Sequence, residues 1–508
     1  MKTLYIYGPP ASGKTYLAKK LEHAYGLEIP DLDAKIVEKI GMSIADFFKL
    51  KGEGEFRRIE TETLKETIAP VVALGGGTLL RAENRAFAEE HGLVGALTAD
   101  PETIAARIAA QSGTRPLGNR AKERRVHYAS FADHIDQDTA VLLPAKYRGR
   151  LAVPVSKSHY HRLMIADFLA GGSAWAKSGA GECADVEATR RCLAALAGNK
   201  PTTTSFEPIL DCGESGSTLR FLAPVAAALG AKPQFIRRGR LAERPMIDYS
   251  SLASGRHELR GDISSQFVTG LLFALPLLNG DSEIVFTTPL QSRGYVDMTL
   301  RVIREYGIEV EETAYGFKVL GNQRFVSPGV FAPEGDWSGA AFWYAANALG
   351  AEVEVTNLSD DSAQPDRAVK ELVRRIASGT GDRDIDISGC PDLFPALAGG
   401  AAATKAETRF VNAARLRIKE SDRIEAMEKT LAAFRVGTWS TDDTVTVIGT
   451  DRRFAACSID SFNDHRIAMA AAVASIRSEG PVLVKGAGSV AKSYPAFFAD
   501  MENLRVKN

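Results

Sequence analysis

Cysteine is scarce in this chain, and so are long apolar runs and any excess of charge. Five cysteines stand among 508 residues, an odd number without a CxxC pair, which predicts reduced thiols and a cytoplasmic protein. The net charge is −1, so no overall basic field would attract nucleic acid. No apolar run reaches the roughly 18 residues that a membrane helix needs. We therefore expect neither a nucleic-acid partner nor a membrane partner, and small molecules remain as ligands.

A glycine-rich motif stands near the start of the chain. Residues 8–15 read GPPASGKT and lie between an apolar stretch and a helical pattern. This context is typical of a P-loop, in which backbone N–H groups surround phosphate oxygens. Lys14 would reach the β- and γ-phosphates of ATP, and Thr15 would bind Mg²⁺. The predicted ATP contacts are Gly8, Gly13, Lys14, Thr15 and, from the basic stretch SGTRPLGNRAKERR, Arg115.

Polar and glycine-rich clusters after the loop indicate a site for a phosphate acceptor. Asp31 and Asp33 lie two residues apart, so on an extended segment they face the same way, although such a pair is often a helix cap. EFRRIE places Arg57 on a probable helix, where ion pairing with glutamates is the alternative role. Gly75–Gly77 end an apolar strand and would let a ligand approach the backbone.

These stretches occur in an order that resembles shikimate kinase over about residues 1–138: GPPASGKT, DLD, GEGEFRRIE, LGGGT, RPL and ERRVHY. The resemblance implies a shikimate site made of Asp33, Arg57, Gly76, Gly77 and Arg125. Asp33 would orient or deprotonate the accepted hydroxyl, Lys14 would serve catalysis, and Asp31 would support Mg²⁺ through water.

Two questions about this first part stay open in the sequence. Val126 stands where the family often has proline, which leaves Arg124 as the alternative to Arg125. The function also has alternatives, namely a nucleotide-sensing module without turnover and a kinase for another small molecule such as gluconate.

From about residue 153 a strand or turn ending in small polar residues is followed six times by an apolar, Ala/Leu-rich helix. Helices that are apolar all round should be buried, so the pattern predicts repeated α/β units with sheets outside and helices inside. The first turn of a helix has free N–H groups and partial positive charge. One such start is more often a structural cap, but six that carry cations or hydroxyls predict a site that gathers negative charges.

The second region resembles 5-enolpyruvylshikimate-3-phosphate (EPSP) synthase from about residue 150 to 508. PVSKSHYHR, CGESGSTLR, ERPM, SSQF, SRGY, CPDLFP, RIKESDR, NDHR and AKSYP occur in that order. That family transfers the enolpyruvyl group of phosphoenolpyruvate to the 5-hydroxyl of shikimate 3-phosphate, without a cofactor. The implied phosphoenolpyruvate contacts are Lys157, Gly216, Arg244, Gln266, Arg423, Arg466 and Lys492. The implied shikimate 3-phosphate contacts are Lys157, Ser158, Arg162, Ser264, Ser265, Gln266, Ser292, Tyr295, Asp392 and Lys419.

The same resemblance assigns the proton transfers to two carboxylates. Asp392 would act as the base and Glu420 as the proton donor to carbon, with Lys157 stabilising charge. Crowded carboxylates raise each other's pKa and nearby cations lower it, and the sequence leaves open which effect wins. The related enolpyruvyl transferase of cell-wall synthesis is the alternative, disfavoured because none of Cys212, Cys390 and Cys457 lies in a matching loop pattern.

The two resemblances together imply a bifunctional enzyme of consecutive steps acting on ATP, shikimate and phosphoenolpyruvate. We expect an α/β protein whose P-loop kinase domain, a parallel sheet with flanking helices, precedes a two-lobed, inside-out α/β barrel. The expected bounds are 1–139 for the kinase domain and 140–508 for the rest, with one lobe at 157–333 and the other at 140–156 plus 334–508.

Overall fold

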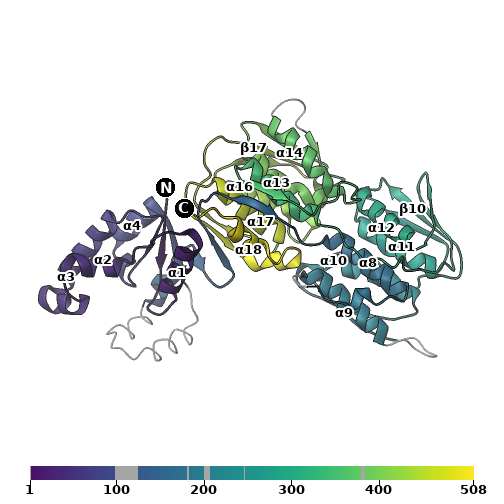
Figure 1. The fold of residues 1–508 in the computed structure, drawn as a ribbon, viewed down its shortest axis with the longest axis horizontal. Coiled ribbons are helices and arrows are strands. Elements are labelled where there is room, and N and C mark those ends of the chain that lie inside the picture. Colours follow the sequence, from purple (N-terminus) through teal and green to yellow (C-terminus); the bar gives the residue numbers. More distant parts are fainter. Residues whose placement is uncertain are drawn as a thin grey trace.

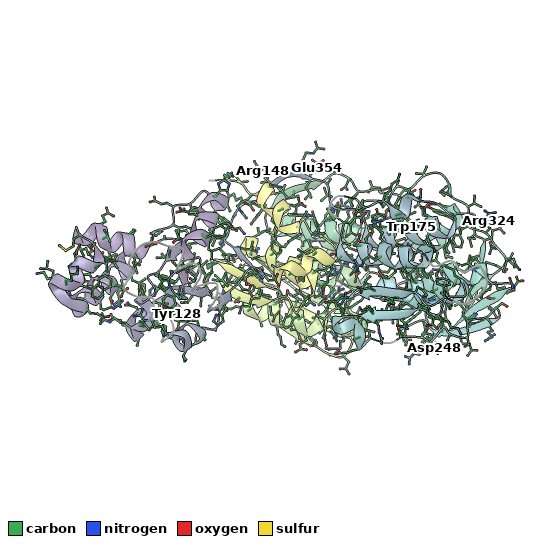
Figure 2. The ribbon with its side chains drawn as sticks, turned by 90° about the horizontal axis from the view of Figure 1, so that it is seen from below. Tyr128, Arg148, Trp175, Asp248, Arg324 and Glu354 are labelled. Atoms are coloured by element: carbon green, nitrogen blue, oxygen red, sulfur yellow. The ribbon has the colours of Figure 1, made fainter. Side chains whose placement is uncertain are left out.

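The computed structural model describes residues 2–97, 124–179, 182–198, 206–244, 246–378 and 384–507, with the side chain of Arg125 outside the description. Figure 1 shows three bodies in a row: the described residues before about 140 at one end, the last third of the chain in the middle, and the described residues between them at the far end. Figure 2 shows the same order from below, with Tyr128 in the first body and Trp175 in the last.

The first body is built on a parallel sheet of order β2-β1-β3-β4. Its strands are β1 (Thr3–Tyr7), β2 (Val71–Ala73), β3 (Gly92–Leu97) and β4 (His134–Ile135). Its helices are α1 (Lys14–Tyr25), α2 (Leu32–Ile40), α3 (Ile44–Glu66), α4 (Ala82–His91) and α7 (Arg125–Ala129). β1 is buried along its whole length, as its apolar sequence predicts, and α3 is kinked at Gly52, where φ is 81°. The parallel sheet with helices beside it is the expected architecture.

The far body holds a hydrophobic core of its own, made of residues between Tyr160 and Phe325. Its helices are α8 (Lys157–Leu169), α9 (Ala184–Gly198), α10 (Gly216–Ala228), α11 (Ser265–Ala274) and α12 (Arg293–Glu305). Its strands are β7 (Ile209–Gly213), β8 (Gln234–Arg237), β9 (Arg256–Arg260), β10 (Ser282–Thr288), β11 (Val310–Thr313) and β12 (Gly316–Val319). They form a sheet of order β11-β12-β10-β9 and a pair β7-β8.

The middle body has a second core, whose residues lie between Leu142 and Leu504. Its helices are α13 (Trp337–Ala348), α14 (Val369–Ser378), α15 (Phe394–Ala401), α16 (Arg423–Ala433), α17 (His465–Ala474) and α18 (Phe497–Leu504). Its strands are β5 (Thr139–Leu142), β6 (Arg148–Leu151), β13 (Glu352–Val355), β14 (Asp384–Asp386), β15 (Glu407–Val411), β16 (Gly437–Ser440), β17 (Thr444–Ile448), β18 (Cys457–Asp460) and β19 (Val482–Lys485). The sheets are β14-β15-β17-β16, β18-β19-β5 and β13-β6.

The six apolar helices that the sequence indicates are α8, α10, α11, α13, α15 and α17, and the last two are buried at every residue. Five of the six begin at a side-chain cap, on Ser156, Ser215, Ser264, Asp336 and Asp464. The expectation of buried helices is thus confirmed, and so is the structural role of most helix starts.

The first and middle bodies share apolar contacts. Tyr25 at the end of α1 clusters with Leu143 and Leu483, and the Arg505 guanidinium carbon lies 3.8 Å from the centroid of its ring. The Tyr25 hydroxyl accepts a hydrogen bond from Leu143 N at 2.9 Å. All five cysteines are free. Within the described residues, no helix is both long and apolar enough to span a bilayer.

Candidate active sites

The P-loop sequence joins β1 to α1 as expected. Positive φ angles of 152° at Gly8 and 104° at Gly13 curl the loop, and a Cβ on Gly8 would lie 2.9 Å from the Leu97 carbonyl oxygen. The Lys14 ammonium folds back over the loop and donates to the carbonyl oxygens of Gly8 at 2.8 Å and Pro9 at 2.9 Å. Thr15 follows in the first turn of α1. The positive φ angles and the folded-back lysine are the arrangement in which a P-loop can surround a phosphate.

Asp33 lies in the first turn of α2, at the edge of the sheet where β1 and β2 end. A Cβ on Gly75 would stand 2.4 Å from its Oδ1, so the missing side chain allows the carboxylate to approach the backbone. Asp31 caps the same helix, because its Oδ1 accepts from Ala34 N at 3.2 Å. The capping alternative thus applies to Asp31, and Asp33 faces the glycines.

Arg57 reaches the same edge from α3. A Cβ on Gly77 would lie 3.0 Å from its Nη2. Its Nη1 pairs at 2.7 Å with Glu60, which is 1% exposed and also accepts from the Thr78 hydroxyl at 2.8 Å. Sequence reasoning did not single out Glu60, although its position four residues after the buried Phe56 indicates the buried face of α3.

Of the two candidate arginines on ERRVHY, the structure brings Arg124 to the site. Its Nη1 lies 3.4 Å from Gly76 O, and the hydroxyl of Tyr128, one helical turn later, donates to the same oxygen at 2.7 Å. The Arg125 side chain and all of Arg115 lie outside the described residues. Asp33, Arg57, Gly76, Gly77 and Arg124 therefore form one cluster beside the P-loop.

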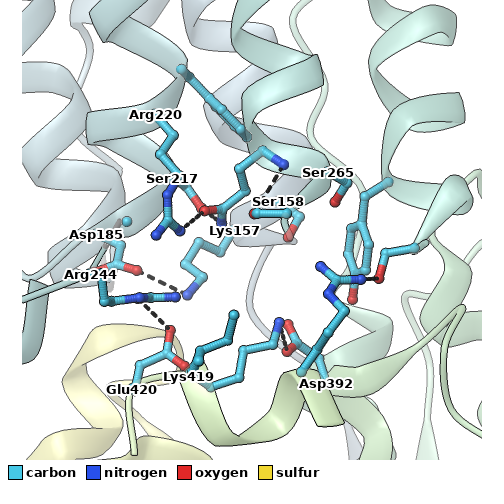
Figure 3. A pocket seen from close by; sticks show the side chains of 18 of the residues that line it. Lys157, Ser158, Asp185, Ser217, Arg220, Arg244, Ser265, Asp392, Lys419 and Glu420 are labelled. Carbon is cyan, nitrogen blue, oxygen red and sulfur yellow. Dashed lines mark hydrogen bonds and ion pairs between the residues drawn. The ribbon is translucent and has the colours of Figure 1, made fainter. Parts of the chain in front are cut away.

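A second site lies between the cores of the far and middle bodies. This cavity, together with the open space at its mouth, measures about 920 Å³ (Figure 3). All ten residues predicted for shikimate 3-phosphate line it, and so do Glu420 and four of the seven predicted for phosphoenolpyruvate: Lys157, Gly216, Arg244 and Gln266. The starts of α8, α10 and α11 contribute Lys157, Gly216 and Ser265. Segments that lie far apart in the sequence thus come together around one polar cavity.

Arg423 and Arg466 stand behind the cavity rather than in its lining. Arg423 is 1% exposed and contacts Asp392 at 2.8 Å, Glu420 at 2.7 Å and Asp464 at 2.9 Å. Arg466 Nη2 lies 3.0 Å from Asp392 Oδ2. Arg423 therefore pairs with both candidate catalytic carboxylates, and Arg466 pairs with Asp392.

Lys492 lies at the boundary between the two bodies. Its ammonium contacts Glu214 at 2.6 Å, and Asn463 donates to the same carboxylate at 3.1 Å. Glu214 belongs to the far body, and the two residues that bind it belong to the middle one. This contact ties the segment before α10 to the end of the chain.

The cations decide the charge state of the cavity carboxylates. Burial acts to raise the pKa of Asp392, but Arg466 and Lys419 outweigh it and hold that pKa well below its usual range. In the same way burial would raise the pKa of Glu420, and Arg423 and Arg244 lower it well below its ordinary value. Burial also lowers the pKa of Lys419 to about 8. Without ligands both carboxyls are therefore ionised at neutral pH.

Three charged residues of the lining were not assigned to the site from the sequence. Asp185 pairs with Lys157 at 2.9 Å, and Arg220 Nη1 donates to the Gln266 side chain at 2.6 Å. Arg415 Nη1 donates to the Ser292 hydroxyl at 2.7 Å. Arg220 was recognisable as part of a helix start that carries polar and charged residues, whereas Asp185 lies in the first turn of α9 with no motif to mark it.

Comparison with known proteins identifies the family of the part of the chain that forms this cavity. Residues 243–501 match the family of EPSP synthase (3-phosphoshikimate 1-carboxyvinyltransferase). The 3-phosphoshikimate 1-carboxyvinyltransferase of Clostridium kluyveri is 36% identical over 411 residues, which are 71% of this chain and 96% of that protein. The chain belongs to the EPSP synthase family. The same enzyme of Clostridioides difficile is 34% identical over 428 residues, 72% of this chain and 96% of its own length.

The remaining part of the chain matches a second family. Residues 10–140 match shikimate kinase. An EPSP synthase structure from Acinetobacter baumannii aligns with a TM-score of 0.55 at 21% identity, covering 73% of this chain and 98% of that one, which shows the shared fold. The chain thus combines a shikimate kinase domain with an EPSP synthase in one bifunctional enzyme of the shikimate pathway.

Proposed function

We propose that the chain phosphorylates shikimate with ATP and then converts the product, shikimate 3-phosphate, with phosphoenolpyruvate into EPSP and phosphate. One observation supports this most: the ten residues predicted for shikimate 3-phosphate, from segments spread between 157 and 419, all line a single cavity. The P-loop and the Asp33–Arg57–Gly77 cluster in the kinase domain form the site that would produce this compound.

In the kinase step, Asp33 orients and deprotonates the acceptor hydroxyl, and Arg57 and Arg124 bind the shikimate carboxylate beside Gly76 and Gly77. Lys14 exchanges its loop carbonyls for the transferred phosphate, whose developing charge it stabilises. Arg115 and Arg125 remain proposed as contacts to ATP and shikimate.

Mg²⁺ fits the edge of the sheet where the P-loop stands. Thr15 offers a hydroxyl in the first turn of α1, and Asp31 a carboxylate at the end of β2, to which it is bridged at Ala73. Oxygen ligands from one or two side chains, completed by nucleotide phosphates and water, are the set that Mg²⁺ prefers. When bound, the ion neutralises phosphate charge.

In the second step, Asp392 accepts the proton of the 5-hydroxyl, and that oxygen forms a bond to C2 of phosphoenolpyruvate. Glu420 donates a proton to C3, which completes a tetrahedral intermediate. Loss of a proton from the new methyl group and cleavage of the C2–O bond to phosphate then give EPSP. No cofactor takes part in this proposal.

The charge states set a condition for these roles. Asp392 is ionised before ligands bind, as a base must be. Glu420 needs a proton for its role. Bound anionic substrates neutralise Arg244 and Lys157, two of the cations that lower the pKa of Glu420, so substrate binding raises that pKa and favours the protonated form. Lys157 and Lys492 stabilise charge on the reacting oxygens.

We also propose that the far and middle bodies are the two lobes, 157–333 and 140–156 plus 334–508, and that they close on the ligands. The cavity is shared between their cores, and Glu214–Lys492 and Arg244–Glu420 connect the two sides at 2.6 and 4.0 Å. The cytoplasmic location expected from the cysteines stays a prediction.

A coupled assay tests the function. Purified protein with ATP, Mg²⁺, shikimate and phosphoenolpyruvate should yield ADP, phosphate and EPSP. Lys14→Ala should abolish ADP formation while added shikimate 3-phosphate is still converted. Asp392→Ala should impair the conversion of shikimate 3-phosphate while ADP formation with shikimate continues. ADP release that needs gluconate instead of shikimate would identify a different kinase, and no release with any acceptor would identify a nucleotide-sensing domain.

A further inference from the structure

Four buried polar side chains connect three helices of the far body in one row of hydrogen bonds. His161 Nδ1 in α8 lies 2.7 Å from the Thr189 hydroxyl in α9. That hydroxyl lies 2.7 Å from the Thr218 hydroxyl in α10, which donates to Ser215 Oγ at 2.8 Å. Each of the four residues is at most 1% exposed. These residues, here called the polar row, join α8, α9 and α10 through hydrogen bonds that water does not reach.

The polar row lies one helical turn behind the lining of the synthase cavity. Lys157 and His161 are four residues apart on α8, so they share a helix face. Asp185 and Thr189 are four residues apart on α9 and share a face in the same way. The Lys157–Asp185 ion pair in the cavity and the His161–Thr189 contact behind it are therefore successive contacts between the same two helices.

The polar row ends at the cap of α10. Ser215 Oγ accepts from the Thr218 hydroxyl and also from Thr218 N at 3.3 Å. The next two residues after this cap, Gly216 and Ser217, line the cavity. The Thr218 hydroxyl also lies 3.3 Å from the Asp185 carbonyl oxygen, which connects the same turn to α9. The place of Gly216 in the cavity therefore depends on the contacts of Thr218.

The charge state of His161 gives the polar row a direction. Burial, followed by the charges of Lys157 and Arg162, lowers the pKa of His161 well below its ordinary value, so the ring is neutral at pH 7. A neutral imidazole has one N–H, and Nε2 is buried without a hydrogen-bond partner in the described part of the chain. We assign the proton to Nδ1, because each threonine hydroxyl can then accept from one neighbour and donate to the next.

We propose that His161 is a positioning residue for the enolpyruvyl transfer. Through Thr189 and Thr218 it holds the start of α10 in the place where Gly216 contacts phosphoenolpyruvate. This inference rests on the proposed function of the cavity. The ten residues predicted for shikimate 3-phosphate come from α8, from α11 and α12 with their caps, and from the middle body, but not from α10. Loss of the polar row should therefore affect the two substrates unequally.

The test changes the middle of the polar row. Thr218→Val keeps the shape of the side chain but removes the hydroxyl, whereas Thr218→Ser keeps the hydroxyl. The full chain is assayed with added shikimate 3-phosphate and without ATP, so that the kinase domain does not turn over. Thr218→Val should raise KM for phosphoenolpyruvate at least about fivefold and change KM for shikimate 3-phosphate less than about twofold. Thr218→Ser should keep both constants within about twofold of wild type.

Variants at the first residue of the polar row separate positioning from packing. His161→Leu removes the donor and should raise KM for phosphoenolpyruvate as Thr218→Val does. His161→Asn should restore most of the affinity, because the amide nitrogen of asparagine can occupy the position of Nδ1.

Thr430→Val is the matched control. Thr430 is 2% exposed, and its hydroxyl donates to the Ala426 carbonyl oxygen of its own helix, α16, at 2.8 Å. Both KM values of Thr430→Val should stay at the wild-type level, although thermal unfolding should report a loss of stability in this variant and in Thr218→Val.

Two outcomes would overturn the proposal. If Thr218→Val raised both KM values by the same factor, the polar row would stabilise the far body as a whole instead of positioning α10. If its KM for phosphoenolpyruvate equalled that of Thr430→Val, the row would not act on the site. Should Thr218→Val not fold, Thr189→Val breaks the same row from α9 and is judged by the same two criteria. Failure of wild type to convert shikimate 3-phosphate at all would instead contradict the proposed function.

Discussion

Tyr25 should fix the kinase domain to the synthase, and removing its hydroxyl tests this. The residue ends α1, is 5% exposed, and its hydroxyl accepts from the backbone N–H of Leu143 at 2.9 Å. Tyr25→Phe leaves the ring in place but deprives that buried N–H of its acceptor, which costs about 1–3 kcal/mol. Hydrogen–deuterium exchange of the α1 amides should therefore become about 5- to 150-fold faster.

A matched change lies on the same helix. Tyr16 is 76% exposed, so Tyr16→Phe should alter exchange by less than about threefold. Arg505 provides a second route to the same contact, since it stacks on the Tyr25 ring and donates to Ala24 O at 2.7 Å. The pair Tyr25→Leu and Arg505→Met should show a coupling energy of about 1–2 kcal/mol. If Tyr25→Phe and Tyr16→Phe exchanged equally fast, the docking described above would be wrong.

Two further predictions concern the chemistry. Because burial lowers the pKa of Lys419 to about 8, its charge is present below that pH and lost above it, so kcat/KM for shikimate 3-phosphate should fall above about pH 8. Lys419→Arg should move that fall to higher pH, and an unmoved limb would exclude Lys419 as its cause. In the kinase, Glu60→Gln should raise KM for shikimate about tenfold, because Arg57 loses its buried partner. Glu62→Gln, which removes only the exposed pair with Arg58, is the control, and equal KM values would contradict the role of Glu60.

The sequence predicted the elements whose pattern is local. The P-loop needs only eight consecutive residues, and the six apolar helices each carry a polar start, so both were readable without tertiary information. The six polar helix starts predicted one site for negative charges, but which residues meet in it came from the resemblance, because no local signal states which helix ends face each other. Asp185 illustrates the limit: it is a partner of Lys157 only because α9 packs beside α8.

Charge balance and domain contacts could not be predicted from composition. Glu420 lies among both cations and carboxylates in the sequence, whereas Asp392 has only uncharged neighbours, and only the distances show that arginines contact both carboxylates. The contact of Arg124 with Gly76 O likewise depends on the tertiary structure, because it joins residues 48 positions apart. The contact of α1 with Leu143 and Leu483 joins residues more than a hundred positions apart, beyond any local pattern.

The junction between the two enzymes is itself a strand of the second one. β5 pairs antiparallel with β19, and just before it Asp138 accepts hydrogen bonds from Ala487 N at 2.9 Å and Gly488 N at 2.6 Å, in the turn that leads to Lys492. Residues added within β5 would therefore shift the register of a sheet of the synthase, so this part of the connection does not tolerate a longer linker. If the two enzymes were expressed separately, β5 would have to remain in the synthase polypeptide. The kinase polypeptide would then expose the apolar end of α1, which packs on Leu143 and Leu483 in the intact chain.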